Sequence, residues 1–390
     1  MENENSVSLA TVHTHTHTGN PIRTRNFVFD LLYVLAIIMV VDDHTNIQVG
    51  ILSKLFPYDS FFMPMFVFIS GYFYKKQNIL ENVKHKAKKM LIPAVIWNIT
   101  MLIIALFIDK IIGTHWFYMP TVKSFIISLF DGTMTSLNGP AWFVVMLLWV
   151  SITYNILRNI IKPNNKVTDI IVTIALTLLG FTSVYLCAKG WCNRGVKYVF
   201  LLKLSFYIQF FNLGYIFKEY FEEKIKRIKR WKIYITCITV NCILILIFGE
   251  KVNFFGTSEM NGFSYWFLPF ITSCTGILFW YTVMSFLAQK IEKNEKITFV
   301  AKNTFTIMES HLMFANIINI LFYILYKKNI LENFNCDVFR YTAWNGAAWA
   351  SKPFSGMLGF LLGITLSIVL AIILDKGKKK IRKIIGTSYE

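Results

Sequence analysis

The densest group of residues that could perform proton chemistry ends the first apolar stretch of the chain. There Asp42, Asp43 and His44 follow one another, and Asp30 lies near the start of the same stretch. A neutral imidazole can remove a proton from an attacking hydroxyl, while a carboxylate holds the other ring nitrogen. One interpretation of these residue types is that His44 is a general base whose ring is oriented by Asp43 or Asp30. The alternative is an interfacial cluster that only marks where a helix leaves the bilayer.

Asp30, Tyr33 and His44 fall on one side of a helix. At about 100° per residue, Tyr33 lies within about 20° of His44 around the axis, and Asp30 within about 40°. The rise of 1.5 Å per residue separates Tyr33 from His44 by roughly 16 Å along the helix. We therefore expect a polar stripe along this helix, with Tyr33 as a candidate substrate contact.

Other polar residues interrupt later apolar stretches. Ser70, which precedes Gly71, can donate a hydrogen bond to an oxyanion, or it belongs only to a small-residue packing motif. Glu309 and His311 lie within TIMESHLMFAN, where an ionisable group at membrane depth is costly and indicates a polar cavity. Trp142 is either a substrate contact or part of an aromatic belt.

Cations gather between the second and third apolar stretches. Lys75 and Lys76 begin this segment, and the run VKHKAKKMLIP contributes Lys86, Lys88 and Lys89. Ammonium groups bind phosphate as point charges, so the segment could hold the phosphates of a cytosolic ligand such as coenzyme A. Alternatively, it is only a topology signal.

The chain that carries these residues is too apolar for an ordinary soluble enzyme. Of its 390 residues, 55% are hydrophobic and only 16% are charged, whereas soluble domains carry roughly 25% charged residues. The net charge of +18 could indicate nucleic acid, but the cations lie in short clusters between apolar runs. That pattern is typical of membrane topology, so we predict a polytopic membrane protein and no nucleic-acid partner.

Ten apolar stretches approach the length of about 20 residues that a membrane-spanning helix needs. We therefore predict an all-α polytopic membrane helix bundle. A shorter amphipathic segment, 121–130, predicts an interfacial helix on the outer side. The ten expected spans are 27–44, 61–74, 91–112, 141–157, 167–188, 199–217, 233–248, 263–288, 305–326 and 354–374.

The cations alternate from loop to loop. With the N-terminus inside, 28 of the 40 Lys and Arg residues fall on the cytoplasmic side and 11 on the other, which places both termini in the cytoplasm. His44 then lies at the outer edge and His311 about two turns in from the cytoplasmic side, so the two need not meet. The expected domains are a disordered cytoplasmic tail (1–21), a transmembrane domain (22–375) and a basic cytoplasmic tail (376–390).

Metal sites and common catalytic motifs have little support in the sequence. Neither a nucleotide-binding nor a common hydrolase motif occurs. His13, His15 and His17 could bind zinc, but a disordered polar tail is the preferred interpretation, and we expect no metal. Cys187 and Cys192 lie at the outer edge of the fifth span and could pair there.

In order and spacing, the motifs resemble the acyltransferase 3 family of integral-membrane O-acyltransferases over residues 22–375. The first span, with Asp30 and His44, resembles the family's opening helix. FVFISGYFYKK resembles its second-helix Ser-Gly-aromatic signature. MLIPAVIW, PAWFVVMLLW and SHLMF resemble the third helix, the fourth-helix Trp motif and a late-helix His. The ten spans match the family core of a stand-alone member without an appended extracytoplasmic domain.

This resemblance implies transfer of an acyl group, usually acetyl from cytosolic acetyl-CoA, to a hydroxyl of a cell-surface glycan or similar extracytoplasmic acceptor. His44 is then the catalytic residue. Acyl-CoA enters as a co-substrate held by Arg25 and the lysine cluster, with no permanently bound cofactor. The expected location is the bacterial cytoplasmic membrane, among its lipids, with a homo-oligomer possible.

One position departs from the family pattern. The family usually has an Arg eleven residues before the catalytic His, and here that position is Tyr33. Arg25, Lys75 or Lys76 could supply the cation instead, or the activity has diverged or been lost. The alternatives to acyl transfer are a transporter or flippase for a glycan or lipid intermediate, and a non-catalytic partner in surface polysaccharide export.

Overall fold

The protein is an all-α bundle, as the sequence predicts. A computed structural model describes residues 26–45, 55–56, 60–117, 121–132, 135–161, 165–252, 260, 262–332, 334–341, 343 and 355–385. Within these residues every regular element is helical, and Phe117 and Thr135 form one isolated antiparallel bridge. Arg25, the N-terminal tail with its three histidines, and residues 386–390 lie outside the described residues.

Each of the ten expected spans corresponds to a helix. Eight helices in the described part are long and apolar enough to cross a membrane. The other two are α1, which carries three carboxylates, and α3, which has 11 residues. The ten are α1 (Phe27–Thr45), α3 (Phe62–Tyr72), α5 (Ile92–Ile112), α7 (Trp142–Ile160), α8 (Lys166–Ala188), α9 (Val196–Ile216), α11 (Arg230–Phe248), α12 (Leu268–Lys290), α14 (Thr304–Lys327) and α17 (Ser355–Ile385).

Shorter helices connect these spans. The expected interfacial segment forms α6 (Val122–Asp131), whose first turn is closed by a reciprocal capping box between Thr121 and Ser124. The remaining short elements are α4 (Ile79–Lys86), η2 (Ala87–Leu91), η3 (Ser136–Ala141), η4 (Trp191–Arg194), η5 (Phe217–Phe221), α10 (Glu222–Arg227), η6 (Gly249–Val252), α13 (Glu295–Lys302) and α15 (Cys336–Tyr341).

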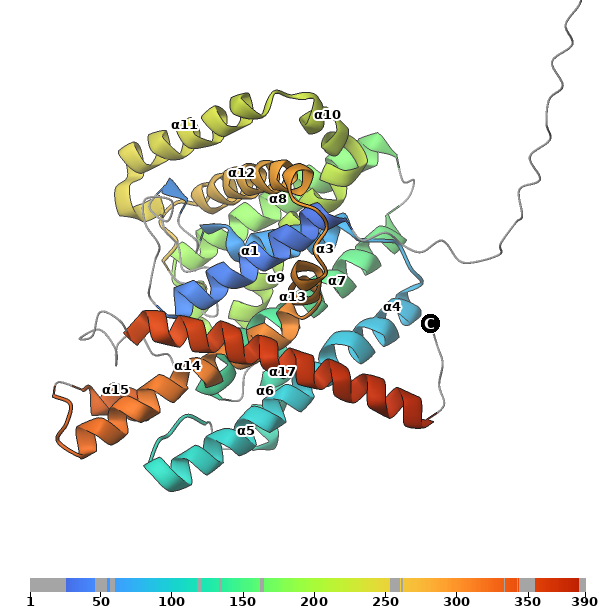
Figure 1. Cartoon of the computed structure of the whole chain (residues 1–390). Coiled ribbons are helices and arrows are strands. Elements are labelled where there is room, and N and C mark those ends of the chain that lie inside the picture. Colours follow the sequence, from blue (N-terminus) through green and yellow to red (C-terminus); the bar gives the residue numbers. More distant parts are fainter. Residues whose placement is uncertain are drawn as a thin grey trace, which may run out of the picture.

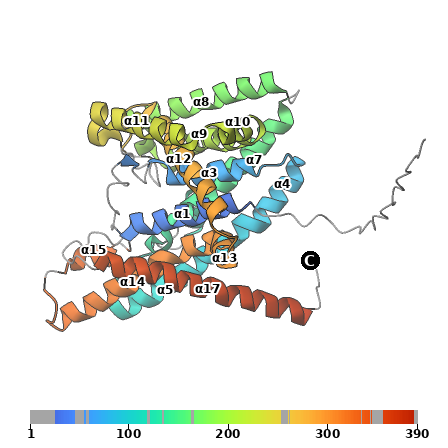
Figure 2. The same cartoon turned by 45° about the horizontal axis from the view of Figure 1, so that its top comes forward.

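The long helices form two groups with α1 and α3 between them. Figures 1 and 2 show α8, α9, α11 and α12 together on one side of the bundle, and α5, α14 and α17 on the other. Ser310 in α14 donates its hydroxyl hydrogen to Ser367 in α17 at 2.8 Å, within the second group. Any site in the middle of the bundle is therefore built around α1 and α3.

The helices α3 and α9 cross at two glycines. A Cβ atom at Gly71 would overlap the carbonyl oxygen of Phe211, and one at Gly214 would overlap the carbonyl oxygen of Phe68. Only glycine lets two backbones approach this closely. The close helix contact expected at Ser70–Gly71 is therefore present, and it fixes the direction in which Ser70 projects.

The helices α13 and α14 run beside α1 in the same direction. The Thr298 hydroxyl donates to Asp30 Oδ2 at 3.0 Å across a sequence separation of 268, and His311 meets His44 across a separation of 267. The expectation that the two histidines need not meet is therefore wrong. The sequence prediction counted membrane depth from residue 305, where the expected span begins. It therefore left out α13, which forms a helix alongside the first turns of α1 and is not only a loop.

Two sulfur atoms lie together at the end of α8. The Cys192 thiol donates to Cys187 Sγ at 2.9 Å, and both residues are free thiols. From the sequence, these two cysteines could pair; the structure brings their sulfur atoms together as free thiols and not as a disulfide.

Candidate active site

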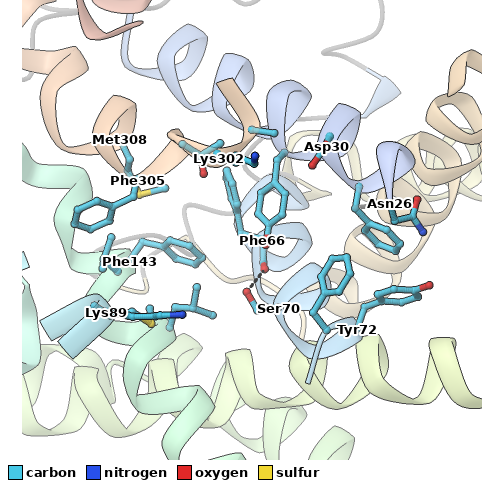
Figure 3. A pocket seen from close by; sticks show the side chains of 18 of the residues that line it. Asn26, Asp30, Phe66, Ser70, Tyr72, Lys89, Phe143, Lys302, Phe305 and Met308 are labelled. Carbon is cyan, nitrogen blue, oxygen red and sulfur yellow. Dashed lines mark hydrogen bonds between the residues drawn. The ribbon is translucent and has the colours of Figure 1, made fainter. Parts of the chain in front are cut away.

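A cavity of about 1090 Å³ opens beside the first turns of α1. Figure 3 shows Asp30, Phe66, Ser70 and Phe143 around it, contributed by α1, α3 and α7. The lining residues from α13 and α14 close the remaining side. Asp30 and Tyr33 both line this space, so the start of the predicted polar stripe faces a cavity.

Four lysines line the cavity. They are Lys75 after α3, Lys89 in η2, Lys218 in η5 and Lys302 in α13. All four are exposed, so they stand where the cavity opens to solvent. Four ammonium groups around one opening attract an anionic ligand and bind phosphate as point charges.

The lysines that we proposed from the sequence as ligand-binding do not all line the cavity. Lys75 and Lys89 line the cavity, whereas Lys76, Lys86 and Lys88 are not among its lining residues. Sequence reasoning missed the other two lining lysines, Lys218 and Lys302, because in the sequence they lie in distant cationic segments between apolar stretches, which it interpreted as topology signals. Only their convergence in space identifies them.

A break in helical register helps to position Lys89. The helix that begins at Ile79 continues through η2, one turn of π-helix, into α5. A π-turn adds a residue to the helical repeat and rotates the residues after it relative to a regular α-helix. The α-helical spacing of the run 84–89 therefore does not predict which of its lysines face the cavity.

Hydrogen bonds to α7 hold the segment that carries Lys75. The Tyr74 hydroxyl donates to Asn155 Oδ1 at 3.0 Å, and the backbone N–H of Gln77 donates to the same atom at 3.2 Å. In return, Asn155 Nδ2 donates to the Gln77 carbonyl at 3.1 Å. Lys75 thus projects from a fixed backbone.

The interior of the cavity is largely apolar. The ring centroid of Phe66 lies 5.9 Å from that of Tyr33 and 5.6 Å from that of Phe143. The Ser70 hydroxyl lines the cavity and donates to the Phe66 carbonyl in its own helix at 2.9 Å. Behind the cationic opening, the space therefore suits an apolar or thioester-bearing chain.

Two histidines meet beyond the cavity. His44 Nδ1 lies 2.6 Å from the Val40 carbonyl and 3.2 Å from His311 Nε2, while His311 Nδ1 lies 3.0 Å from the Ile307 carbonyl. A carbonyl only accepts, so in each neutral ring Nδ1 carries the hydrogen. His44 Nε2 then carries a lone pair, which is the form that a general base requires.

On α14, the lining of the cavity comes within one helical turn of this histidine pair. Met308, which lines it, precedes His311 by three residues, or about 4.5 Å of helix rise. His311 is completely buried, and His44 is only partly exposed. Neither histidine is among the lining residues, and on α1 the last lining residue, Tyr33, lies about 16 Å of helix rise before His44.

The carboxylates proposed to orient His44 occupy different places. Asp30 lies about 21 Å from His44 along α1, too far to touch its ring, and it accepts a hydrogen bond from Thr298. Asp43 is the sequence neighbour of His44 at the end of α1 and is partly exposed. The partner that the structure places against the imidazole across the bundle is His311, which the sequence offered only as a substrate contact.

Glu309 is completely buried in a polar network between helices. Asn138 Nδ2 lies 3.3 Å from Glu309 Oε2 and 3.1 Å from Asn98 Oδ1, and Thr135 donates its hydroxyl hydrogen to Asn138 Oδ1 at 3.0 Å. Asn98 Nδ2 in turn donates to the Gly132 carbonyl at 3.1 Å. This network anchors η3 against α14, and Glu309 is not among the cavity-lining residues.

Trp142 is buried in the protein and does not face lipid. Its side chain is 3% exposed, and Lys203 Nζ lies 5.0 Å from its ring centroid. This burial excludes a place in an aromatic belt, and the ring is not among the cavity-lining residues either. In the part of the chain that the structure describes, no group of three or more His, Cys, Asp or Glu side chains is placed to hold a metal ion.

Comparison with known proteins yields one match. A family model described as an acyltransferase domain, acyltransferase 3, matches residues 26–376 and so covers nearly the whole chain. No curated protein and no solved structure matches this chain.

Proposed function

Because this chain belongs to the acyltransferase 3 family, we propose that it is a multi-pass membrane O-acyltransferase that takes its acyl group from cytosolic acyl-CoA. The observation that carries this proposal is the cavity with four lysines among its exposed lining residues and a histidine pair that begins one helical turn after its lining residue Met308. A volume of about 1090 Å³ exceeds the common range for drug-sized ligands and suits a long co-substrate.

In this proposal the phosphates of coenzyme A bind at Lys75, Lys89, Lys218 and Lys302. The pantetheine arm follows the apolar interior past Phe66 and Phe143 toward Met308. The thioester then approaches the histidines from the cytoplasmic side, which the cation distribution assigns to the lysine-bearing end. The lysines also supply the positive charge that the family's usual Arg would bring at Tyr33.

His44 acts as the general base. Its Nε2 takes the proton of an acceptor hydroxyl while the hydroxyl oxygen attacks the thioester carbonyl. The C–S bond breaks, and the thiolate receives that proton from the imidazolium, so the products are an ester and free coenzyme A. The charged ring directs its Nδ1–H at two acceptors, the Val40 carbonyl and His311 Nε2, and both stabilise it.

The acceptor and the acyl group follow from the family resemblance. We propose an acetyl group and a hydroxyl of a cell-surface glycan or similar extracytoplasmic molecule, because His44 lies at the end of α1 away from the lysines. The corresponding location is the bacterial cytoplasmic membrane.

The test measures release of coenzyme A thiol from acetyl-CoA by the full-length protein in nanodiscs, with candidate glycan acceptors. His44→Gln should lower kcat by about 10²–10⁴, the usual contribution of a general base. His115→Gln is the matched control, since that ring is 57% exposed and is not among the cavity-lining residues. Equal rates in wild type and His44→Gln would refute the assigned role.

A further inference from the structure

A second, apolar groove lies next to the cavity, behind a wall of aromatic side chains. It has a volume of about 370 Å³ and is lined by residues of α9, η5 and α10 on one side and of α12 on the other, together with Phe68 of α3. Figure 2 shows how the helices α9, α10 and α12 are arranged. Tyr72 lines the cavity and Tyr281 lines the groove. Glu222 accepts hydrogen bonds from both hydroxyls, at 2.6 and 3.1 Å, and so ties the two sides of the wall together.

The lining of this groove suits hydrocarbon. Its walls are aliphatic and aromatic side chains such as Leu213, Phe217, Ile225 and Leu278, together with the thiol of Cys274. The phenol of Tyr281 is its remaining polar group, and that hydroxyl already donates to Glu222. A ligand in the groove therefore gains contact mainly through apolar surface.

The length of the groove matches one leaflet of a bilayer. Leu213 and Ile225 both line it and are twelve residues apart on the nearly continuous helix α9–η5–α10, or about 18 Å at 1.5 Å per residue. The hydrocarbon core of one leaflet is about 15 Å thick, half of the full core. One acyl chain of a membrane lipid can therefore lie along the groove.

Cations mark the end of the groove at Ile225. Lys224 and Lys226 flank this residue in sequence, and Lys224 Nζ lies 5.7 Å from the ring centroid of Phe221, another lining residue. Lys226 pairs with Glu222 and Glu223 at 3.1 and 2.8 Å.

The surrounding segment keeps an excess of positive charge. Residues 218–232 contain seven Lys and Arg but three Glu. Of the three glutamates, Glu219 faces Lys218 at 3.6 Å, and the other two face Lys226. Lys224 and Arg227 are exposed and lie within two residues of Ile225 in the chain, so they add positive charge near this end of the groove, on the side that the cation distribution assigns to the cytoplasm.

We propose that this groove binds an anionic phospholipid of the cytoplasmic leaflet. One acyl chain lies along the surface from Leu213 to Ile225, and the phosphate is held by Lys224 and Arg227. We infer a lipid because the lining is apolar, and an anionic headgroup because the side chains near the end of the groove are cationic. The assignment does not depend on the acyl-transfer reaction.

The test titrates the full-length protein in detergent with dioleoylphosphatidylglycerol and, separately, with dioleoylphosphatidylcholine, and counts bound lipids by native mass spectrometry. Wild type should bind the phosphatidylglycerol at least tenfold more tightly. Leu278→Trp, which fills the groove, should lose this tight binding. Leu246→Trp is the matched control on α11, where the side chain is 85% exposed and outside the groove.

A second pair of variants tests the charge near the groove. Lys224→Gln with Arg227→Gln should remove the preference for phosphatidylglycerol, whereas Lys378→Gln with Lys380→Gln, exposed on α17, should retain it. Equal affinity of wild type for both lipids would overturn the proposal, as would unchanged binding in Leu278→Trp or in the Lys224/Arg227 variant. No acyl donor is present, so the result is independent of the proposed enzyme activity.

Discussion

At the scale of single residues, the site depends on two backbone carbonyls that fix two imidazole tautomers. The carbonyls of Val40 and Ile307 each require a hydrogen on the neighbouring Nδ1. That requirement leaves His311 Nε2 as an acceptor toward His44 and leaves a lone pair on His44 Nε2. His311 is thus a positioning residue for His44.

Substitution of His311 tests this arrangement. His311→Gln should lower kcat by up to about tenfold, the scale of one net hydrogen bond of about 0.5–1.5 kcal/mol. The KM for acyl-CoA should stay unchanged, because His311 does not line the cavity. Steady-state kinetics separate the two parameters, and a raised KM with normal kcat would show instead that His311 contacts the donor.

At the scale of elements, contacts between pairs of helices position the side chains of the site. The glycine contact between α3 and α9 sets the position of Ser70, and the parallel run of α13 and α14 beside α1 brings His311 to His44. Both depend on contacts between segments far apart in the chain. They therefore decide where the reactive groups meet.

A methyl group at Gly71 should disrupt the contact between α3 and α9. Gly71→Ala places a Cβ atom against the Phe211 backbone, which cannot move aside as a side chain could. Overpacking of this kind costs about 1–3 kcal/mol, so the thermal unfolding temperature in detergent should fall clearly. Gly377→Ala is the control, because nothing lies within 4 Å of its added Cβ atom. Equal unfolding temperatures would contradict the account of this helix crossing.

Local sequence patterns were sufficient to predict the helices but not the contacts between helices that are far apart in the chain. Apolar stretches predicted the eight long helices as well as α1 and the shorter α3, and the Ser70–Gly71 pair predicted a close approach, because both properties are local. His311 was placed too far from His44, since the depth of α14 depends on how α13 packs. Lys218 and Lys302 were missed because a loop lysine looks the same in sequence whether or not it borders a cavity.

At the scale of the whole molecule, the lysines that attract an anionic donor lie apart from the histidines proposed to catalyse acyl transfer. Lysines from four separate segments line the cavity, and the histidine pair lies outside its lining. Binding energy for an anionic donor should therefore come mainly from the lysines, while the rate of the chemical step should depend on His44. The two sets of residues should affect different kinetic parameters.

The most direct test compares acyl-CoA kinetics in three variants of the full-length protein. Lys75→Gln with Lys89→Gln removes two cations from the cavity, and Lys76→Gln with Lys88→Gln removes their sequence neighbours outside it. We expect the first pair to raise the KM for acetyl-CoA several-fold with little change in kcat, an effect that salt should also produce. The second pair should behave as wild type, and His44→Gln should lose kcat while still binding coenzyme A. Equal effects of the two lysine pairs, or wild-type turnover in His44→Gln, would contradict the account.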